Sequence, residues 1–337
     1  MTSIKPEYLR LLSAVILFAI ALSLRLGAIN DTVVVNPIRN DASEYYSYAL
    51  NLKFHHTYSR AIYSENTPTP DAYRAPGYPA FLVPLAEYPP TRNMLWRISM
   101  FQALLDSMTV LLALGIFRAI MTEGWALGAA FLTAISPHLI SATTYLLTET
   151  LFTFLMTLSL WLAVKMVKQN SKTFAFLAGL MIAAAALTRP TLQYFIIPLI
   201  FLLMFAGNRA SYTRLIIPLV AGFLLTVSPW ALRNLSIIGS FADPSLTTNS
   251  VYHGIYPDFM YQDIPESRAI PYRFDPRSEE ISNSKENLLG EIRRRFTEEP
   301  MRHLEWYLLG KPAHLLDWDI IAGMGDIYIY HVADSPY

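Results

Sequence analysis

Long apolar stretches constrain the fold of this chain more than any other feature of its sequence. A helix needs about 20 mostly apolar residues to cross the hydrocarbon core of a membrane. Such stretches lie near residues 9–29, 95–120, 125–145, 147–167, 173–188, 191–207 and 213–233. Because 53% of the residues are hydrophobic and only 15% are charged, the composition agrees with this interpretation. The sequence therefore predicts an all-α integral membrane protein with a bundle of about seven transmembrane helices.

The first apolar stretch could instead be a cleaved signal peptide. Arg25 interrupts it, however, and no cleavage site of small residues follows, so a retained helix is the better interpretation. Basic residues mark the helix ends that face the same side as the N-terminus, and by the positive-inside rule this side is the cytoplasm. They are Lys5, Arg10, Arg118, Lys165, Lys168, Lys172, Arg209 and Arg214.

This orientation divides the chain into four parts. Residues 1–29 form the cytoplasmic N-terminus and the first transmembrane helix, and residues 95–233 contain transmembrane helices 2–7. Residues 30–94 and 234–337 form two large non-cytoplasmic segments, whereas only short turns face the cytoplasm. Any chemistry that needs space is therefore expected on the non-cytoplasmic side.

Both non-cytoplasmic segments contain patterns of ordered structure. In the first, Tyr45, Tyr48, Ala49 and Leu52 recur at helical spacing and predict a short amphipathic helix at the membrane interface. In the second, Pro300 indicates a helix start, and residues 240–285 are expected to form an ordered loop or short strands. Aromatic and apolar residues then follow that a bilayer surface would hold: Trp306, Tyr307, Leu308, Leu309 and Trp318.

Charge, cysteine content and motifs exclude several classes of function. The 26 basic and 26 acidic residues cancel, so no global basic field attracts nucleic acid. Without cysteine the chain has no disulfide, no thiolate metal site and no cysteine nucleophile. It also lacks HExxH, Walker and GxSxG motifs. His55 and His56 are adjacent and would point about 100° apart on a helix, so loop histidines are favoured over a metal site.

Asp41 is the first candidate for chemistry, and two interpretations of it stay open. In "DASE", Asp41 can be the N-cap of the amphipathic helix, with Glu44 completing a capping box. Such a carboxylate is also held in a fixed position, as a general base must be. Sequence physics alone slightly favours the capping role, and the two roles are compatible.

Arginines and one glutamate at the outer ends of the predicted helices form a second candidate group. The arginines are Arg74 in "YRAPGYP", Arg189 in "LTRPT" and Arg233 in "PWALRN". Snorkelling to lipid headgroups would explain Arg189 and Arg233, but a phosphate at the outer face would suit their guanidinium groups better. Glu149 begins the fourth predicted helix and is either a functional carboxylate or part of a helix start with Thr148.

Several of these motifs together resemble those of the GT-C polytopic glycosyltransferases, in particular the bacterial protein O-mannosyltransferase and lipid A aminoarabinose transferase type. "DASEYYSYALNL" is similar to the family's stretch after the first membrane helix, and "RAPGYPAFL" to its R-x-P-G-Y-P-x-F-L. "LLTETLFTFL", "LTRPT" and "SPWALRNLSIIGSF" follow in the family's order. "NSVYHGIYPD" resembles a loop motif but lacks one Asn, and the family's further C-terminal helices are missing, so the chain is interpreted as a fragment or a shortened member.

The resemblance implies a donor in which a sugar is linked through phosphate to a polyprenol. Transfer to an acceptor hydroxyl, on a lipid, glycan or protein, would occur with inversion on the periplasmic face of the bacterial inner membrane. Asp41 would be the general base, and Arg189 and Arg233 would bind the phosphate. Arg74 and Glu149 would shape the pocket, and Tyr45, Tyr78 and Tyr252 would contact the sugar. Membrane lipids are expected partners, and neither nucleic acid, a cofactor nor a divalent metal is expected.

Two other classes of function remain as alternatives. A multi-pass transporter or lipid flippase would show inverted repeats and helices interrupted near the middle of the membrane. Here the charged residues instead fall at the predicted helix ends, and both large segments lie on one side. A structural membrane scaffold is the third possibility.

Overall fold

The computed structural model describes residues 6–205, 209–241, 243, 251–268, 270–316 and 330–336. The chain divides into two compact units. The first comprises Met1–Phe241 with Val332–Tyr337, and the second comprises Ala242–His331. Each unit is described separately below.

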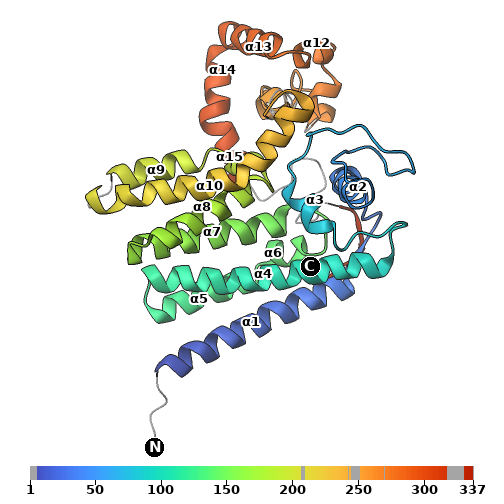
Figure 1. Ribbon diagram of the computed structural model, residues 1–337. Helices are drawn as coiled ribbons and strands as arrows, with labels where there is room; N and C mark the ends of the chain where they lie inside the picture. Colours follow the sequence, from blue (N-terminus) through green and yellow to red (C-terminus); the bar gives the residue numbers. More distant parts are fainter. Residues whose placement is uncertain are drawn as a thin grey trace, which may run out of the picture. The chain divides into compact units, whose positions relative to one another are not determined.

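The first unit is a helical bundle (Figure 1). Its helices pack side by side in the order α1 (Pro6–Asp31), α4 (Arg92–Ile120), α7 (Glu149–Gln169), α8 (Lys172–Ala186), α10 (Arg209–Ile238) and α9 (Ile196–Phe205). Helix α5 (Glu123–Ala134) packs against both α1 and α4. The bundle thus follows the order of the chain, except that α10 lies between α8 and α9.

The apolar helices confirm an all-α membrane protein. Four of them, α1, α4, α7 and α10, are long and apolar enough to cross a membrane, and α8 and α9 are shorter apolar helices. The number of seven crossings therefore stays a prediction. Within the described residues, the strands are the short antiparallel pair β1 (Val33–Val34) and β2 (Val332–Asp334).

The predicted helix at 125–145 is wrong as a single element, because the structure breaks it into α5 and α6 (Pro137–Ala142). Pro137 has no amide hydrogen to continue the helix of α5 and instead occupies the first turn of α6. The carbonyl of Ala134 is left at the end of α5, where Nη1 of Arg25 donates to it at 2.5 Å. Arg25 on α1 also forms a buried ion pair of 2.6 Å with Asp106 on α4. The carbonyl at the break therefore has a hydrogen-bond donor, the charged side chain of Arg25 inside the bundle.

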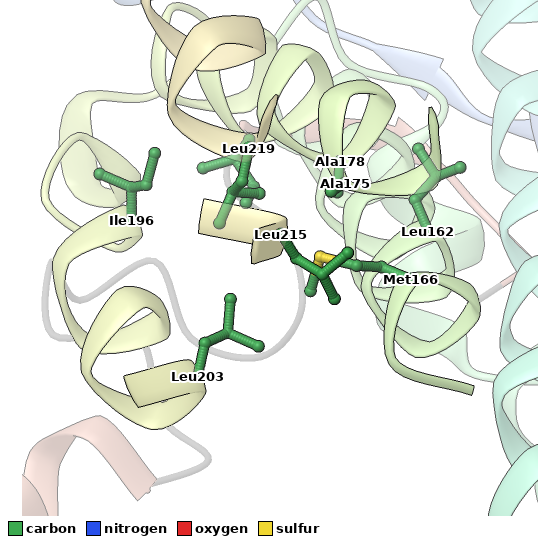
Figure 2. Packing of buried hydrophobic residues seen from close by; sticks show 9 residues of the cluster. Leu162, Met166, Ala175, Ala178, Ile196, Leu203, Leu215 and Leu219 are labelled. Atoms are coloured by element: carbon green, nitrogen blue, oxygen red, sulfur yellow. The ribbon is translucent and has the colours of Figure 1, made fainter. Parts of the chain in front are cut away.

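The contact between α8 and α10 depends on two glycines. A Cβ atom on Gly179 would lie 2.0 Å from the carbonyl oxygen of Leu219, and one on Gly222 would lie 2.1 Å from that of Phe176. Small residues permit such close backbone approach in membrane helices. Figure 2 shows the core beside this contact, with Leu162 on α7, Ala175 and Ala178 on α8, Leu203 on α9, and Leu215 and Leu219 on α10.

Helices α2 (Asn40–His55) and α3 (Gly77–Leu82) lie at one end of the bundle (Figure 1). The residue that precedes α2 is Arg39, and no side chain caps this helix. The prediction that Asp41 is the N-cap is therefore wrong, because Arg39 occupies that position and the helix begins at Asn40, so that Asp41 belongs to its first turn. The face predicted to lie at the membrane interface packs instead on protein, since Tyr45, Tyr48 and Ala49 are buried.

The second unit consists of short helical elements. They are η2 (Pro257–Phe259), η3 (Pro265–Ser267), η4 (Pro271–Arg273), α12 (Ser278–Ser282), α13 (Lys285–Glu298), α14 (Pro300–Glu305), η5 (Trp306–Gly310) and α15 (Lys311–Leu316).

Several expectations for this region can be compared with these elements. In the described part of 240–285, helical turns replace the predicted strands, since proline at the first position of each turn favours helical dihedrals. The helix start at Pro300 is confirmed. Trp306 is buried within the unit rather than exposed, and Trp318 lies outside the described residues.

Candidate functional site

Two carboxylates of α2 hold one arginine, which lies three residues before α3. Nη2 of Arg74 lies 2.6 Å from Oδ1 of Asp41, and its Nε lies 2.5 Å from Oε2 of Glu44. Asp41 and Glu44 are three residues apart and share one face of the helix. Although burial lowers the pKa of Arg74, the attraction of Asp41, Tyr45 and Glu44 outweighs it and holds the pKa above its usual value. Arg74 is thus a fixed cation with two anionic neighbours.

A second ion pair belongs to the same cluster. Nη1 of Arg189, just after α8, donates to Oε1 of Glu149 at the first position of α7, at 2.5 Å. Burial raises the pKa of the Tyr45 hydroxyl to about 12, and the charges of Arg74, Asp41, Glu149 and Arg189 also act on it. Coulomb interactions decay with distance, so these four charged groups lie close enough to Tyr45 to act on its hydroxyl. The cluster contains two cations and, with Glu44, three carboxylates.

The main chain of Arg74 is fixed from both sides. Its amide donates to the hydroxyl oxygen of Tyr48 at 3.3 Å, and its carbonyl accepts from the hydroxyl of Tyr58 at 3.0 Å. The rings of Tyr48 and Tyr58 stack with centroids 4.2 Å apart, and the hydroxyl of Tyr48 also donates to Asp71. Two buried phenols therefore fix the main chain of Arg74, and Asp41 and Glu44 hold its guanidinium.

Arg233 anchors the chain segment between α2 and α3, which includes Tyr58 and Asp71. Its guanidinium donates to the carbonyl oxygens of Asp71 at 2.6 Å and Tyr58 at 3.2 Å, and it lies over the ring of Trp230. The structure thus places Arg233 against the main chain of Tyr58 and Asp71, whereas Arg189 and Asp41 belong to the cluster around Tyr45. Its role as a phosphate ligand stays a prediction.

The "RAPGYP" motif connects the cluster to the bundle. The amide of Gly77 donates to the carbonyl of Leu187 at 2.8 Å, which lies two residues before Arg189. The fully buried Tyr78 donates to Oε1 of Gln102 on α4 at 2.8 Å, and its ring meets that of Tyr45 edge-on. These contacts give Tyr78 a structural role, and contact with a sugar stays a prediction.

Tyr252 belongs to the second unit. It is 2% exposed and packs with Ile255, Tyr256, Ile281 and Leu288 in the core of that unit. Its hydroxyl oxygen accepts a hydrogen bond from Tyr256 at 2.8 Å. A sugar would have to displace these neighbours to reach the ring of Tyr252.

Sequence reasoning missed two features of the cluster. Glu44 was considered only as part of a capping box, although its spacing from Asp41 predicts a shared helix face. The contact of Arg74 with Asp41 could not be foreseen from the sequence, because it joins residues 33 positions apart. Within the described residues, no group of three or more His, Cys, Asp or Glu is placed to hold a metal ion.

Comparisons with known proteins agree with this architecture. The family model of dolichyl-phosphate-mannose-protein mannosyltransferases matches residues 91–232. A comparison with curated protein sequences gives no significant match.

Two solved structures of the Archaeoglobus fulgidus oligosaccharyltransferase are similar to this chain. The first, tethered with an acceptor peptide, has a TM-score of 0.54 at 20% identity and covers 67% of this chain and 30% of that chain.

The second solved structure is the oligosaccharyltransferase AglB in complex with an inhibitory peptide and a dolichol-phosphate. It has a TM-score of 0.51 at 16% identity and covers 90% of this chain and 39% of that chain. This chain therefore spans well under half the length of either archaeal chain. Residues 91–232 thus resemble a family of membrane mannosyltransferases, and the chain shares the fold of these archaeal oligosaccharyltransferases.

Proposed function

We propose that this protein transfers a sugar from a polyprenyl-phosphate-linked donor to an acceptor hydroxyl, with inversion at the anomeric carbon. The observation that carries the proposal is the contact of Arg74 with Asp41 and Glu44 beside the Arg189–Glu149 pair. The cluster combines cations for a departing phosphate with a carboxylate for an incoming hydroxyl. The GT-C fold supports the same chemistry.

Arg74 and Arg189 are the proposed ligands of the donor phosphate. Each now pairs with carboxylates, and each is only partly exposed, at 24% and 39% of the side chain. A phosphate matches the planar donor fork of a guanidinium as well as a carboxylate does, so the donor would exchange with these carboxylates. The archaeal structure with a dolichol-phosphate shows that a related fold binds a lipid phosphate.

Asp41 is the proposed general base. Its side chain is 54% exposed, and only one of its oxygens contacts Arg74 among the described residues. The other oxygen can accept the proton of an acceptor hydroxyl. A phosphate-linked sugar carries a good leaving group, so the second carboxylate that glycosidases use as an acid is not needed. The positive charges of Arg74 and Arg189 would stabilise the negative charge of the departing phosphate.

The proposed location follows from the substrate and from the basic residues at one end of the predicted helices. The polyprenol would remain in the bilayer of the bacterial inner membrane while its phosphate reaches the periplasmic face. Residues 30–94, which carry Asp41 and Arg74, would lie on that face. The acceptor would be a lipid, a glycan or a protein.

Asp41→Asn tests this function. Asparagine preserves the size of the side chain and one acceptor oxygen for Arg74, and exposed ion pairs contribute only about 0–1 kcal/mol to stability. The melting temperature should therefore change little. Because a neutral amide cannot take up the acceptor's proton, transfer should fall on the order of 100-fold or more. The measurement is transfer from a polyprenyl-phosphate sugar in membrane preparations.

Asp31→Asn is the matched control. Asp31 is exposed at the end of α1 and makes no side-chain ion pair within the described residues. This variant should transfer at the normal rate. If folded Asp41→Asn protein shows the same turnover as Asp31→Asn protein, Asp41 is not the base.

A further inference from the structure

A cavity of about 370 Å³ lies beside α2 in the first unit. Its volume falls within the range of small-molecule sites, about 300–1,000 Å³. Its lining is mainly apolar, with tyrosine rings beside the aliphatic side chains of Ile38, Leu50 and Ile62, and it includes the polar side chains of Glu44, Ser47 and Arg60. Nothing in the cluster described above uses this cavity, except that Glu44 belongs to both.

Helix geometry explains how Glu44 belongs to both sites. Successive residues of an α-helix are rotated by about 100°, so Asp41, Tyr45 and Tyr48 share the face toward Arg74. Tyr46 and Ser47 point to the cavity on another face. Glu44 lies at the boundary, where one oxygen accepts from Nε of Arg74 while the residue also lines the cavity. The two sites are therefore continuous through a single carboxylate.

The polar groups of the cavity include both donors and acceptors. In the described part of the chain, neither the hydroxyl of Ser47 nor the guanidinium of Arg60 makes a side-chain hydrogen bond or ion pair. The Arg60 guanidinium instead lies 4.3 Å from the centroid of the Tyr73 ring. Glu44 adds a negatively charged acceptor. These three side chains are available to a ligand.

Tyrosine rings form the aromatic part of the lining. The rings of Tyr63 and Tyr88 meet with centroids 4.8 Å apart, and the hydroxyl of Tyr46 is held by the carbonyl of Glu87. Tyr88 keeps 59% of its surface exposed, and Ile62 beside it keeps 88%. Rings fixed at one edge present flat apolar faces to a ligand.

We propose that this cavity binds the carbohydrate part of the acceptor. A sugar has hydroxyls that both donate and accept, which match Glu44, Ser47 and Arg60, and it has C–H faces that pack on tyrosine rings. A lipid chain would pack on the apolar part of the lining but would offer no hydrogen bond to Glu44, Ser47 or Arg60. This inference rests on the proposed function, and it selects a glycan or glycolipid among the acceptors. The acceptor hydroxyl would reach Asp41 past Glu44.

Saturation-transfer NMR on the full chain in lipid nanodiscs tests the inference without a donor. The probes are the methyl glycosides of glucose, galactose, mannose and N-acetylglucosamine, each titrated alone. At least one should bind to the unmodified protein. Ser47→Trp fills the cavity and should abolish the signal, and Arg60→Gln removes a charged donor and should weaken binding on the order of tenfold. Arg92→Gln, which changes an exposed arginine outside the cavity, should bind as the unmodified protein does.

Three results would overturn the inference. They are the absence of binding by every glycoside, binding that neither Ser47→Trp nor Arg60→Gln affects, and binding of farnesol that Ser47→Trp removes while glycosides do not compete. If Ser47→Trp protein fails to fold, Arg60→Gln still tests the inference, because Arg60 is exposed and its substitution should weaken glycoside binding. A protein that binds glycosides but consumes no polyprenyl-phosphate sugar would disprove the proposed function and leave the glycoside site standing.

Discussion

Removing one partner of the buried Arg25–Asp106 pair should destabilise the bundle strongly. Both side chains are buried, at 0% and 1% exposure, and Nε of Arg25 lies 2.6 Å from the carboxylate. Nη1 of Arg25 donates to the carbonyls of Ala21 at 3.1 Å and Ala134 at 2.5 Å, whereas the buried Nη2 makes no hydrogen bond to any residue that the structure describes. In Asp106→Leu protein, an arginine that cannot lose its proton would stay in the bundle with only two carbonyls.

The expected cost follows from these contacts. Breaking a buried pair costs about 3–5 kcal/mol, because the remaining charge stays desolvated. Arg25→Met should cost less than Asp106→Leu, since a lone carboxyl can take up a proton. The double variant leaves no buried charge and should be more stable than Asp106→Leu alone. At about 2–4 °C per kcal/mol, Asp106→Leu should lower the melting temperature by roughly 6–20 °C.

Thermal unfolding of the purified protein in detergent measures all three variants as a double-mutant cycle. Asp31→Leu, at an exposed position of α1, is the control and should melt near the unmodified protein. If Asp106→Leu protein is as stable as the double variant, Arg25 without its carboxylate does not destabilise the bundle, and the expected cost is refuted.

Three further variants test other contacts. Arg74→Lys keeps the charge but cannot reach Asp41 and Glu44 through separate nitrogens, so donor affinity should fall on the order of tenfold in a binding titration. In Gly77→Ala protein the new Cβ would lie 2.9 Å from the backbone oxygen of Leu187. It should lower the free energy of unfolding by about 1–3 kcal/mol and reduce transfer, whereas Gly124→Ala, with nothing within 4 Å, should do neither. Burial of Glu291 raises its pKa, but hydrogen bonds from arginines lower it from 4.5 to about 2. Its stabilising effect is therefore complete above about pH 4.5 and is lost as the pH falls toward 2. The stability difference between the unmodified protein and Glu291→Gln should shrink over that interval in pH-dependent unfolding.

The sequence by itself determined the class of this protein. Long apolar runs must form helices in a membrane because each backbone group then finds its partner within the same segment. The break at Pro137 has the same local origin, since proline lacks the required donor, and it could have been predicted. The shared face of Asp41 and Glu44 likewise follows from helix spacing alone.

Tertiary structure alone decided which charged residues meet. Asp41 and Arg74 are 33 residues apart, Glu149 and Arg189 are 40 apart, and Arg233 contacts a carbonyl 162 residues away. Sequence spacing within an element says nothing about such pairs, because their distances depend on how helices and loops pack. For this reason the sequence could propose Arg189 and Arg233 as phosphate ligands, but it could not show that Arg74 lies beside Asp41 or that Arg233 contacts the carbonyl of Asp71.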